Sequence, residues 1–135
     1  MLVLFRAASE ESKQLANKFK ELSGLKCELC EAEGYEFEVL EHLELPVVFI
    51  IDKSDELHEF IVKREKDSRD MRMQAYSRRY LNNLRFVVVN CEDLAFAQFV
   101  DEGLKGLGAK RLLNLCSEGL SEDYFKEFHE KIMKK

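Results

Sequence analysis

The most reactive side chains in this sequence belong to its four cysteines. Two of them form a Cys-x-x-Cys motif, Cys27-Glu-Leu-Cys30, which at the start of a helix would indicate dithiol redox chemistry or a zinc site. Residues 25–30, however, alternate between apolar and polar side chains, as a half-buried strand does. Residues three apart on a strand point to opposite faces, so the two sulfur atoms cannot bond unless the strand is broken. This pattern favours Cys27 in the core and Cys30 as a bystander over a disulfide.

The other two cysteines, Cys91 and Cys116, each follow an apolar run that is typical of a strand. Parallel sheets present ligands and catalytic groups at the carboxyl ends of their strands. Cys30, Cys91 and Cys116 are therefore the alternative candidates for a reactive thiol. We expect no metal site, because structural zinc needs further ligands and the three histidines lack ligand-like spacing.

The spacing of apolar residues predicts the elements that must position these groups. Strands are expected over residues 2–5, 25–30, 47–51, 86–89 and 112–115. Helices are expected over residues 9–22, 35–43, 73–84, 96–104 and 121–132, and residues 60–62 are expected to pair as a hairpin with the strand before them. Because strands and helices alternate, the sequence predicts an α/β fold with a largely parallel sheet and helices on both faces.

Two segments near the start resemble parts of the thioredoxin-like superfamily. Residues 2–7 resemble the family's first central strand, and residues 13–22 resemble the helix that follows its redox motif. Between them, Ser9-Glu-Glu-Ser12 occupies the place of Cys-x-x-Cys, with serines at both thiol positions. Leu45-Pro46 resembles the cis-proline turn beside the redox site, and residues 119–128 resemble the closing helix.

The resemblance implies a three-layer thioredoxin-like sheet with a cis Leu45–Pro46 bond. It also implies a groove around Ser9, Ser12, Leu45 and Pro46 that engages an extended protein segment. Dithiol exchange is not expected in that groove, since a hydroxyl forms no disulfide and no thiolate is present to attack. Residues 64–118 depart from the family as an insertion or extension, made of an extra helix and a βαβ unit within a single domain spanning residues 1–135.

Charge is unevenly distributed along the chain. Residues 27–51 contain seven glutamates and no Lys or Arg, whereas residues 63–85 contain eight basic residues and three acidic ones. Two solvated faces would explain this pattern, and so would surfaces that guide a protein partner or a second copy of the chain. We expect residues 63–85 to form a helix whose arginines Arg72, Arg78 and Arg79 lie off its apolar stripe.

Length and composition limit the function further. A chain of 135 residues with 46% hydrophobic and 35% charged residues is expected to form one globular domain, and its richness in Glu and Lys resembles that of heat-adapted proteins. A net charge of −5 argues against general nucleic-acid binding. We found no apolar run that could span a bilayer and no signal peptide, so we expect a cytoplasmic protein.

Taken together, the sequence predicts a non-redox binding or interaction module that engages a protein partner or self-associates. We expect no membrane partner and no cofactor, and we favour a binding role over enzyme activity. Two alternatives stay open. One is a thiol oxidoreductase or peroxide-reducing enzyme that uses a displaced cysteine, and the other is a Rossmann-like domain that binds a small ligand at its strand ends. The sequence lacks the glycine-rich phosphate loop that a Rossmann-like domain would be expected to have.

Overall fold

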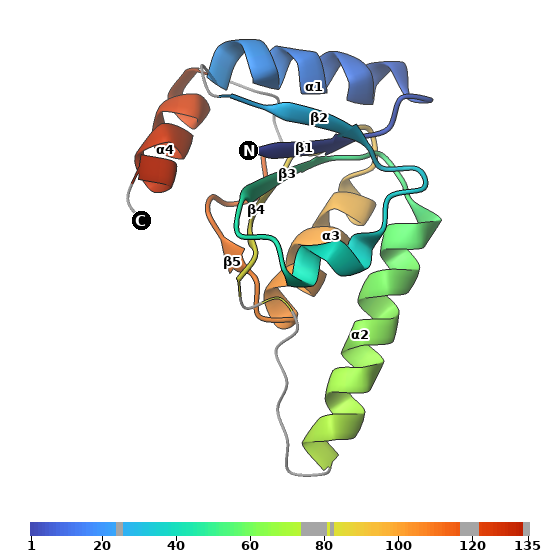
Figure 1. Cartoon of the computed structure of the whole chain (residues 1–135). Coiled ribbons are helices and arrows are strands. Elements are labelled where there is room, and N and C mark those ends of the chain that lie inside the picture. Colours follow the sequence, from blue (N-terminus) through green and yellow to red (C-terminus); the bar gives the residue numbers. More distant parts are fainter. Residues whose placement is uncertain (24–25, 74–80, 82, 117–121, 134–135) are drawn as a thin grey trace.

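Five parallel strands form one sheet, in the order β2-β1-β3-β4-β5 (Figure 1). The computed structural model describes residues 1–23, 26–73, 81, 83–116 and 122–133. The strands are β1 (Leu2–Phe5), β2 (Glu28–Glu31), β3 (Pro46–Ile50), β4 (Arg85–Val88) and β5 (Lys110–Arg111). Each neighbouring pair is parallel, and an isolated bridge between Val89 and Cys116 continues the β4 edge beyond β5.

Helices cover both faces of this sheet, which confirms the predicted α/β class. The helices are α1 (Glu10–Ser23), the short 3-10 helix η1 (Phe37–Glu41), α2 (Asp55–Met73), α3 (Leu94–Gly106) and α4 (Glu122–Met133). One face packs against α1 and α4, and the other packs against η1, α2 and α3. None of the described helices is both long and apolar enough to cross a membrane.

The central strand β3 shows why the apolar runs become strands. Its residues from Val47 to Ile50 are all buried, as expected for a parallel strand that is covered on both faces. Val48 and Ile50 join the core on the side of α1, while Val47 and Phe49 join the core on the opposite side. This alternation follows from the two-residue repeat of a strand and divides the interior into two layers.

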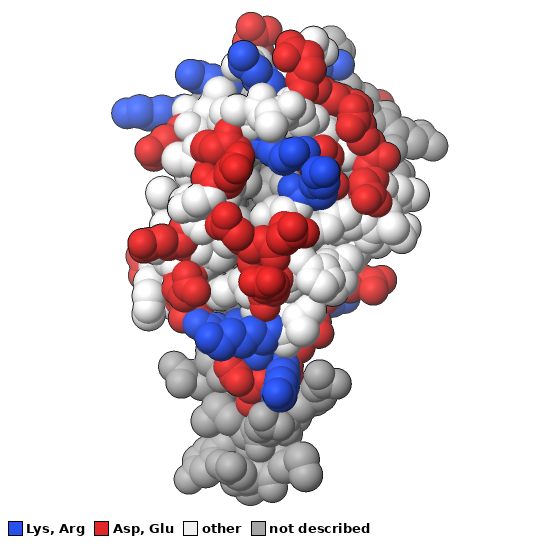
Figure 2. All heavy atoms as spheres, turned by 90° about the vertical axis from the view of Figure 1, so that its right-hand side faces the viewer, with Lys and Arg blue, Asp and Glu red and all other residues white. Residues whose placement is uncertain are grey.

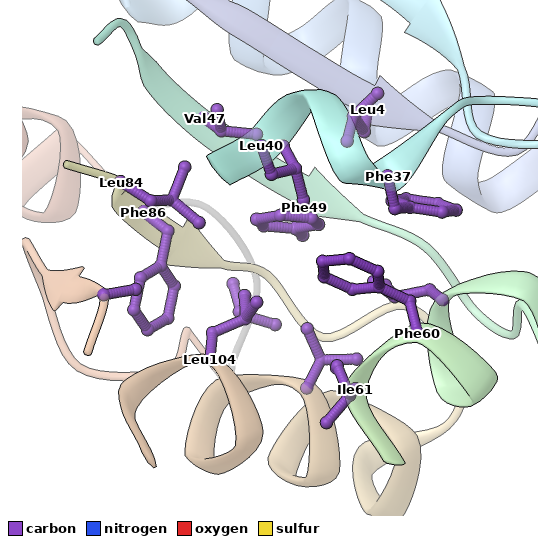
Figure 3. Packing of buried hydrophobic residues seen from close by; sticks show 14 of the residues in the cluster. Leu4, Phe37, Leu40, Val47, Phe49, Phe60, Ile61, Leu84, Phe86 and Leu104 are labelled. Atoms are coloured by element: carbon purple, nitrogen blue, oxygen red, sulfur yellow. The ribbon is translucent and has the colours of Figure 1, made fainter. Parts of the chain in front are cut away.

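The larger core layer lies under α2 and α3 (Figure 3). Leu57, Phe60 and Ile61 form one apolar stripe of α2, and their buried side chains pack α2 against the sheet. Gly103 lets α3 approach closely, because a Cβ atom there would lie only 2.6 Å from Cγ2 of Ile61. These packed residues lie in the first half of α2, and the rest of the helix extends beyond the other elements in Figure 1.

Two local expectations are wrong, and a third lies mostly outside the described residues. Residues 60–62 belong to α2, not to a hairpin strand, because Leu57 starts a helical apolar stripe that includes Phe60 and Ile61. Most of the helix expected over 73–84 lies outside the described residues, which leave out 74–80 and 82 and so include neither Arg78 nor Arg79. Of its ends, Met73 is the last residue of α2 and Leu84 directly precedes β4. The strand expected over 112–115 is reduced to β5 and the bridge at Cys116.

The thioredoxin-like expectation is also wrong. A thioredoxin-like sheet would include a hairpin after the proline strand, but here every described strand pair is parallel. The described residues contain no cis peptide bond, so Leu45–Pro46 is trans. Residues 85–116 are not an insertion into a smaller fold, because β4 and β5 complete the same sheet.

Candidate functional site

The carboxyl edge of the sheet changes direction between β1 and β3. After β1 the chain crosses to β2 on one side, and β3 then leads to β4 on the other. The connections that leave β1 and β3 therefore diverge, and ligands of open α/β sheets bind in the crevice at such a point. A cavity of about 270 Å³ lies here, bordered by the segments that follow β1, β2 and β3.

The connection from β1 to α1 is built around two buried serines. The Ser12 hydroxyl accepts a hydrogen bond from the Arg6 backbone N–H at 2.8 Å and donates one to the carbonyl oxygen of Ile50 at the end of β3. The Ser9 hydroxyl accepts from the Ser12 N–H at 3.3 Å. Each serine thus ties the start of α1 to the surrounding backbone, which is a structural role.

An ion pair joins the ends of β1 and β3. Nη1 of Arg6 donates to Oδ2 of Asp52 at 2.7 Å, and Asp52 is only 8% exposed. The second carboxylate oxygen, Oδ1, is buried and has no hydrogen-bond partner among the described residues. A buried acceptor in this state is a group that a water molecule or a ligand would satisfy.

The cavity wall carries charges of both signs. Arg6 and Lys53 supply two cations, and the Ser54 hydroxyl caps α2 by accepting from the Leu57 N–H at 3.1 Å. The positive end of the α2 dipole faces the same region, because α2 starts at Asp55. The remaining polar lining is acidic: Glu33, Asp55 and Glu56.

Backbone contacts fix the acidic side of the cavity. Glu31 accepts hydrogen bonds from the backbone N–H groups of Ala7 at 2.7 Å and Glu33 at 3.2 Å. Glu56 accepts from the Gly34 N–H at 3.3 Å, and Gly34 has a φ of +79°, which favours glycine. The segment after β2 is therefore held against both β1 and α2, so the two walls of the cavity are connected.

A second group of side chains lies between α1 and the end of β4. The pKa of Cys91 is raised to about 11, first because its thiol is buried and then because Glu11 and Asp52 are nearby carboxylates. The pKa of Glu11 is also raised, chiefly by its hydrogen bond to the carboxyl group of Glu92. Glu92 has a φ of +64°, an uncommon conformation for a residue with a side chain. These surroundings favour the neutral thiol at Cys91.

The four cysteines are free thiols and do not form one site. Cys27 packs in the core under α1, whereas Cys30 packs against the core under α2, as the strand alternation predicts. Cys116 is buried and lines a separate cavity of about 500 Å³ beside β5 and α4. The described part of the chain contains no group of three acidic, His or Cys side chains that could hold a metal ion.

Cys30 should be the only thiol that a labelling reagent modifies in the folded protein. Cys30 is half-buried, while the other three are buried. We expect labelling to be slower than that of free cysteine, because burial and Glu28 raise the pKa of Cys30 and deplete the thiolate. Time-resolved labelling with mass spectrometry checks this, with Cys30→Ser as the control that should remain unlabelled. Preferential labelling of Cys91 or Cys116 would contradict it and support a thiol enzyme.

The groove expected around Ser9, Ser12, Leu45 and Pro46 is not formed. The two serines lie at the carboxyl edge of the sheet, where Ser12 contacts Ile50, while Pro46 begins β3 at the amino edge. Opposite ends of a five-residue strand are roughly 13 Å apart. The two serines and the proline are both placed at strand ends, but these ends lie at opposite edges of the parallel sheet, so the residues do not line one groove.

The site residues that the sequence analysis missed are Arg6, Asp52 and Lys53. Asp52 and Lys53 directly follow the longest apolar run, and Arg6 directly follows the first one. Polar residues immediately after buried parallel strands meet at one edge of the sheet, and this signal could have identified them.

Comparison with solved structures assigns the fold. A flavodoxin from Streptococcus pneumoniae TIGR4 is 12% identical and matches with a TM-score of 0.61, covering 98% of this chain and 94% of that chain. A flavodoxin-like domain from Synechococcus is 11% identical and matches with a TM-score of 0.51, covering 96% and 86%. The fold is therefore flavodoxin-like, which corrects the thioredoxin-like assignment. No family model matches the sequence, and no curated protein matches it either.

Proposed function

We propose that this chain is a non-redox binding module and that its ligand occupies the cavity between the ends of β1 and β3. The observation that carries the proposal is the mixed charge of this cavity at the point where the crossovers diverge. Lys53 suits an anionic group, next to Arg6, which already pairs with Asp52 through one of its five N–H donors. Glu33 and Asp55 suit an ammonium group. The ligand class that complements both is a small zwitterion.

Flavin mononucleotide does not fit the same edge. Flavodoxin holds this cofactor at the β1/β3 divergence, and a phosphate there needs free N–H groups at the start of α1. In this chain the N–H groups of Arg6, Ser9 and Ser12 all donate to oxygen atoms within the connection. Glu10 and Glu11 also place two carboxylates in the first turn of α1, where they would repel a phosphate. We therefore assign the cavity no flavin chemistry.

Thiol chemistry is not favoured either. A catalytic cysteine needs an accessible thiolate in electropositive surroundings. Cys91 is buried beside carboxylates that raise its pKa, and Cys30 is beside Glu28. These surroundings support a binding module over an oxidoreductase.

Titration with simple zwitterions tests the proposal. We expect calorimetry to detect millimolar binding of 4-aminobutyrate, with weaker binding of butyrate and butylamine, each of which retains only one of the two charges. Lys53→Gln should weaken 4-aminobutyrate binding several-fold, because it removes one of the two cations that line the cavity. Lys18→Gln, an exposed lysine on α1, is the matched control and should bind as wild type does. Equal binding by all three compounds would contradict the proposal.

A protein partner is the second candidate, and the distribution of charge favours it. The face that contains α2 carries clusters of acidic side chains with basic side chains both above and below them (Figure 2). Such a surface steers a partner with complementary charges.

A further inference from the structure

We propose that α2 is a self-association surface, on which two copies of this chain pair as antiparallel helices. The inference does not depend on the zwitterion site, since Glu59, Val62 and Lys66, which carry it, do not line that cavity. Asp55 and Glu56 line the cavity and only add negative charge at the same end of α2. Self-association is one of the two partner classes that the uneven charge of the sequence allows.

The outward face of α2 is defined by the residues that its packing leaves uncovered. Leu57, Phe60 and Ile61 are buried, while Glu59 and Lys66 are exposed. Val62 is 42% exposed and lies between the two charged residues on the same face, by the 3.6-residue repeat. An exposed apolar residue is thus bordered by opposite charges, each about one helical turn away.

Charge along this face is self-complementary. The first turns of α2 are acidic, with Asp55, Glu56 and Glu59 all exposed, and the following turns add the exposed Lys63 and Lys66. Arg64 is already committed to Glu41 at 2.8 Å, so it is not counted. On the exposed face the described side chains are acidic at the start of α2 and basic at Lys63 and Lys66, whereas Glu65 and Asp67 are only half-exposed, and Asp67 pairs with Arg64 at 3.7 Å. Such a face complements a second copy only when the two helices run antiparallel.

A two-fold axis near Val62 satisfies these charges. It would place Glu59 of one copy opposite Lys66 of the other, and by symmetry the same pair would form twice, as in any two-fold interface. The two positions are seven residues and about 10 Å apart along the helix, so each pair lies well away from the axis. The valines at the axis would add the apolar contact.

The shape of the molecule makes the pairing accessible. The second half of α2, which includes Lys66, extends beyond the sheet and the other helices (Figure 1), while Glu59 and Val62 are exposed on the half that packs. An interface of one helix pair is small, and exposed ion pairs contribute little each. We therefore expect a weak dimer that dissociates as the salt concentration rises.

Charge reversal at Glu59 and Lys66 gives the decisive experiment, with sedimentation equilibrium as the measurement. Wild type should dimerise at about 50 mM NaCl and dissociate at about 500 mM. Glu59→Lys and Lys66→Glu should each weaken the dimer at least about tenfold, because like charges then face each other. An equimolar mixture of the two variants should recover dimers, since the first variant has lysine at both positions and the second has glutamate at both.

Every outcome bears on the pairing. Lys18→Glu on α1 is the matched control and should dimerise as wild type does. A wild type that stays monomeric at low salt overturns the proposal, as do single variants that still dimerise, or a mixture that stays monomeric. Circular dichroism should show that both variants keep their fold, because both side chains are exposed. Binding of 4-aminobutyrate by the monomeric variants tests the cavity separately.

Discussion

Ser12→Ala should lower the free energy of unfolding by about 2–4 kcal/mol, because each buried group left without its partner costs about 1–3 kcal/mol. The hydroxyl of Ser12 is fully buried and has two backbone partners, the Arg6 N–H and the Ile50 carbonyl. Alanine would leave both partners unsatisfied at the junction of β1, β3 and α1. Urea unfolding followed by circular dichroism measures the loss.

Gln14→Ala is the matched control for Ser12→Ala, since Gln14 lies on the exposed side of the same helix. We expect its effect to stay within about 0.5 kcal/mol. Equal unfolding midpoints for Ser12→Ala and the control would show that the serine does not hold this edge together. The structural account of the Ser9 and Ser12 positions would then be wrong.

Phe19→Ala should cost about 3–5 kcal/mol, which is the usual range for removing a buried phenylalanine. Phe19 is fully buried, and its ring centroid lies 5.1 Å from that of Phe125 and 5.3 Å from that of Phe128. These contacts join α1 to α4 over the sheet. Removing the ring leaves a cavity at the centre of the smaller core layer and weakens the docking of α4.

The control for Phe19→Ala is Leu22→Ala, three residues further along the same helix. Leu22 is 46% exposed, so less apolar surface returns to water and we expect a loss below about 1 kcal/mol. Thermal unfolding of both variants gives the comparison. A Phe19→Ala loss no larger than that of Leu22→Ala would show that α4 does not pack on α1 as described.

Local periodicity was enough to predict most of the elements. The apolar repeats of α1, α3 and α4 and the continuous run of β3 are properties of neighbouring residues, so the sequence alone reveals them. Residues 60–62 were misassigned because three consecutive apolar residues fit a strand when Leu57 is left out of the pattern. Including Leu57 produces the helical spacing that the structure confirms.

Topology could not be derived in the same way. A strand, helix, strand start followed by an apolar strand fits either a thioredoxin-like or a flavodoxin-like sheet, and the two folds differ in how the later strands pair. The pairing of β3 with β4 joins residues about forty apart, such as Pro46 with Arg85, and no local pattern encodes it. The position of Arg6 and Asp52 directly after apolar strands was a local signal, but their ion pair spans 46 residues, so the sequence does not show that the two side chains meet.

We propose that the cavity at the carboxyl edge of β1 and β3 binds a small zwitterion without redox chemistry. The decisive measurement is two-dimensional ¹H–¹⁵N NMR of the full chain during titration with 4-aminobutyrate. We expect saturable shifts at the amides of Arg6, Lys53 and Ser54, which Lys53→Gln diminishes. Saturable shifts confined to other parts of the chain, or none at these three amides, would contradict it.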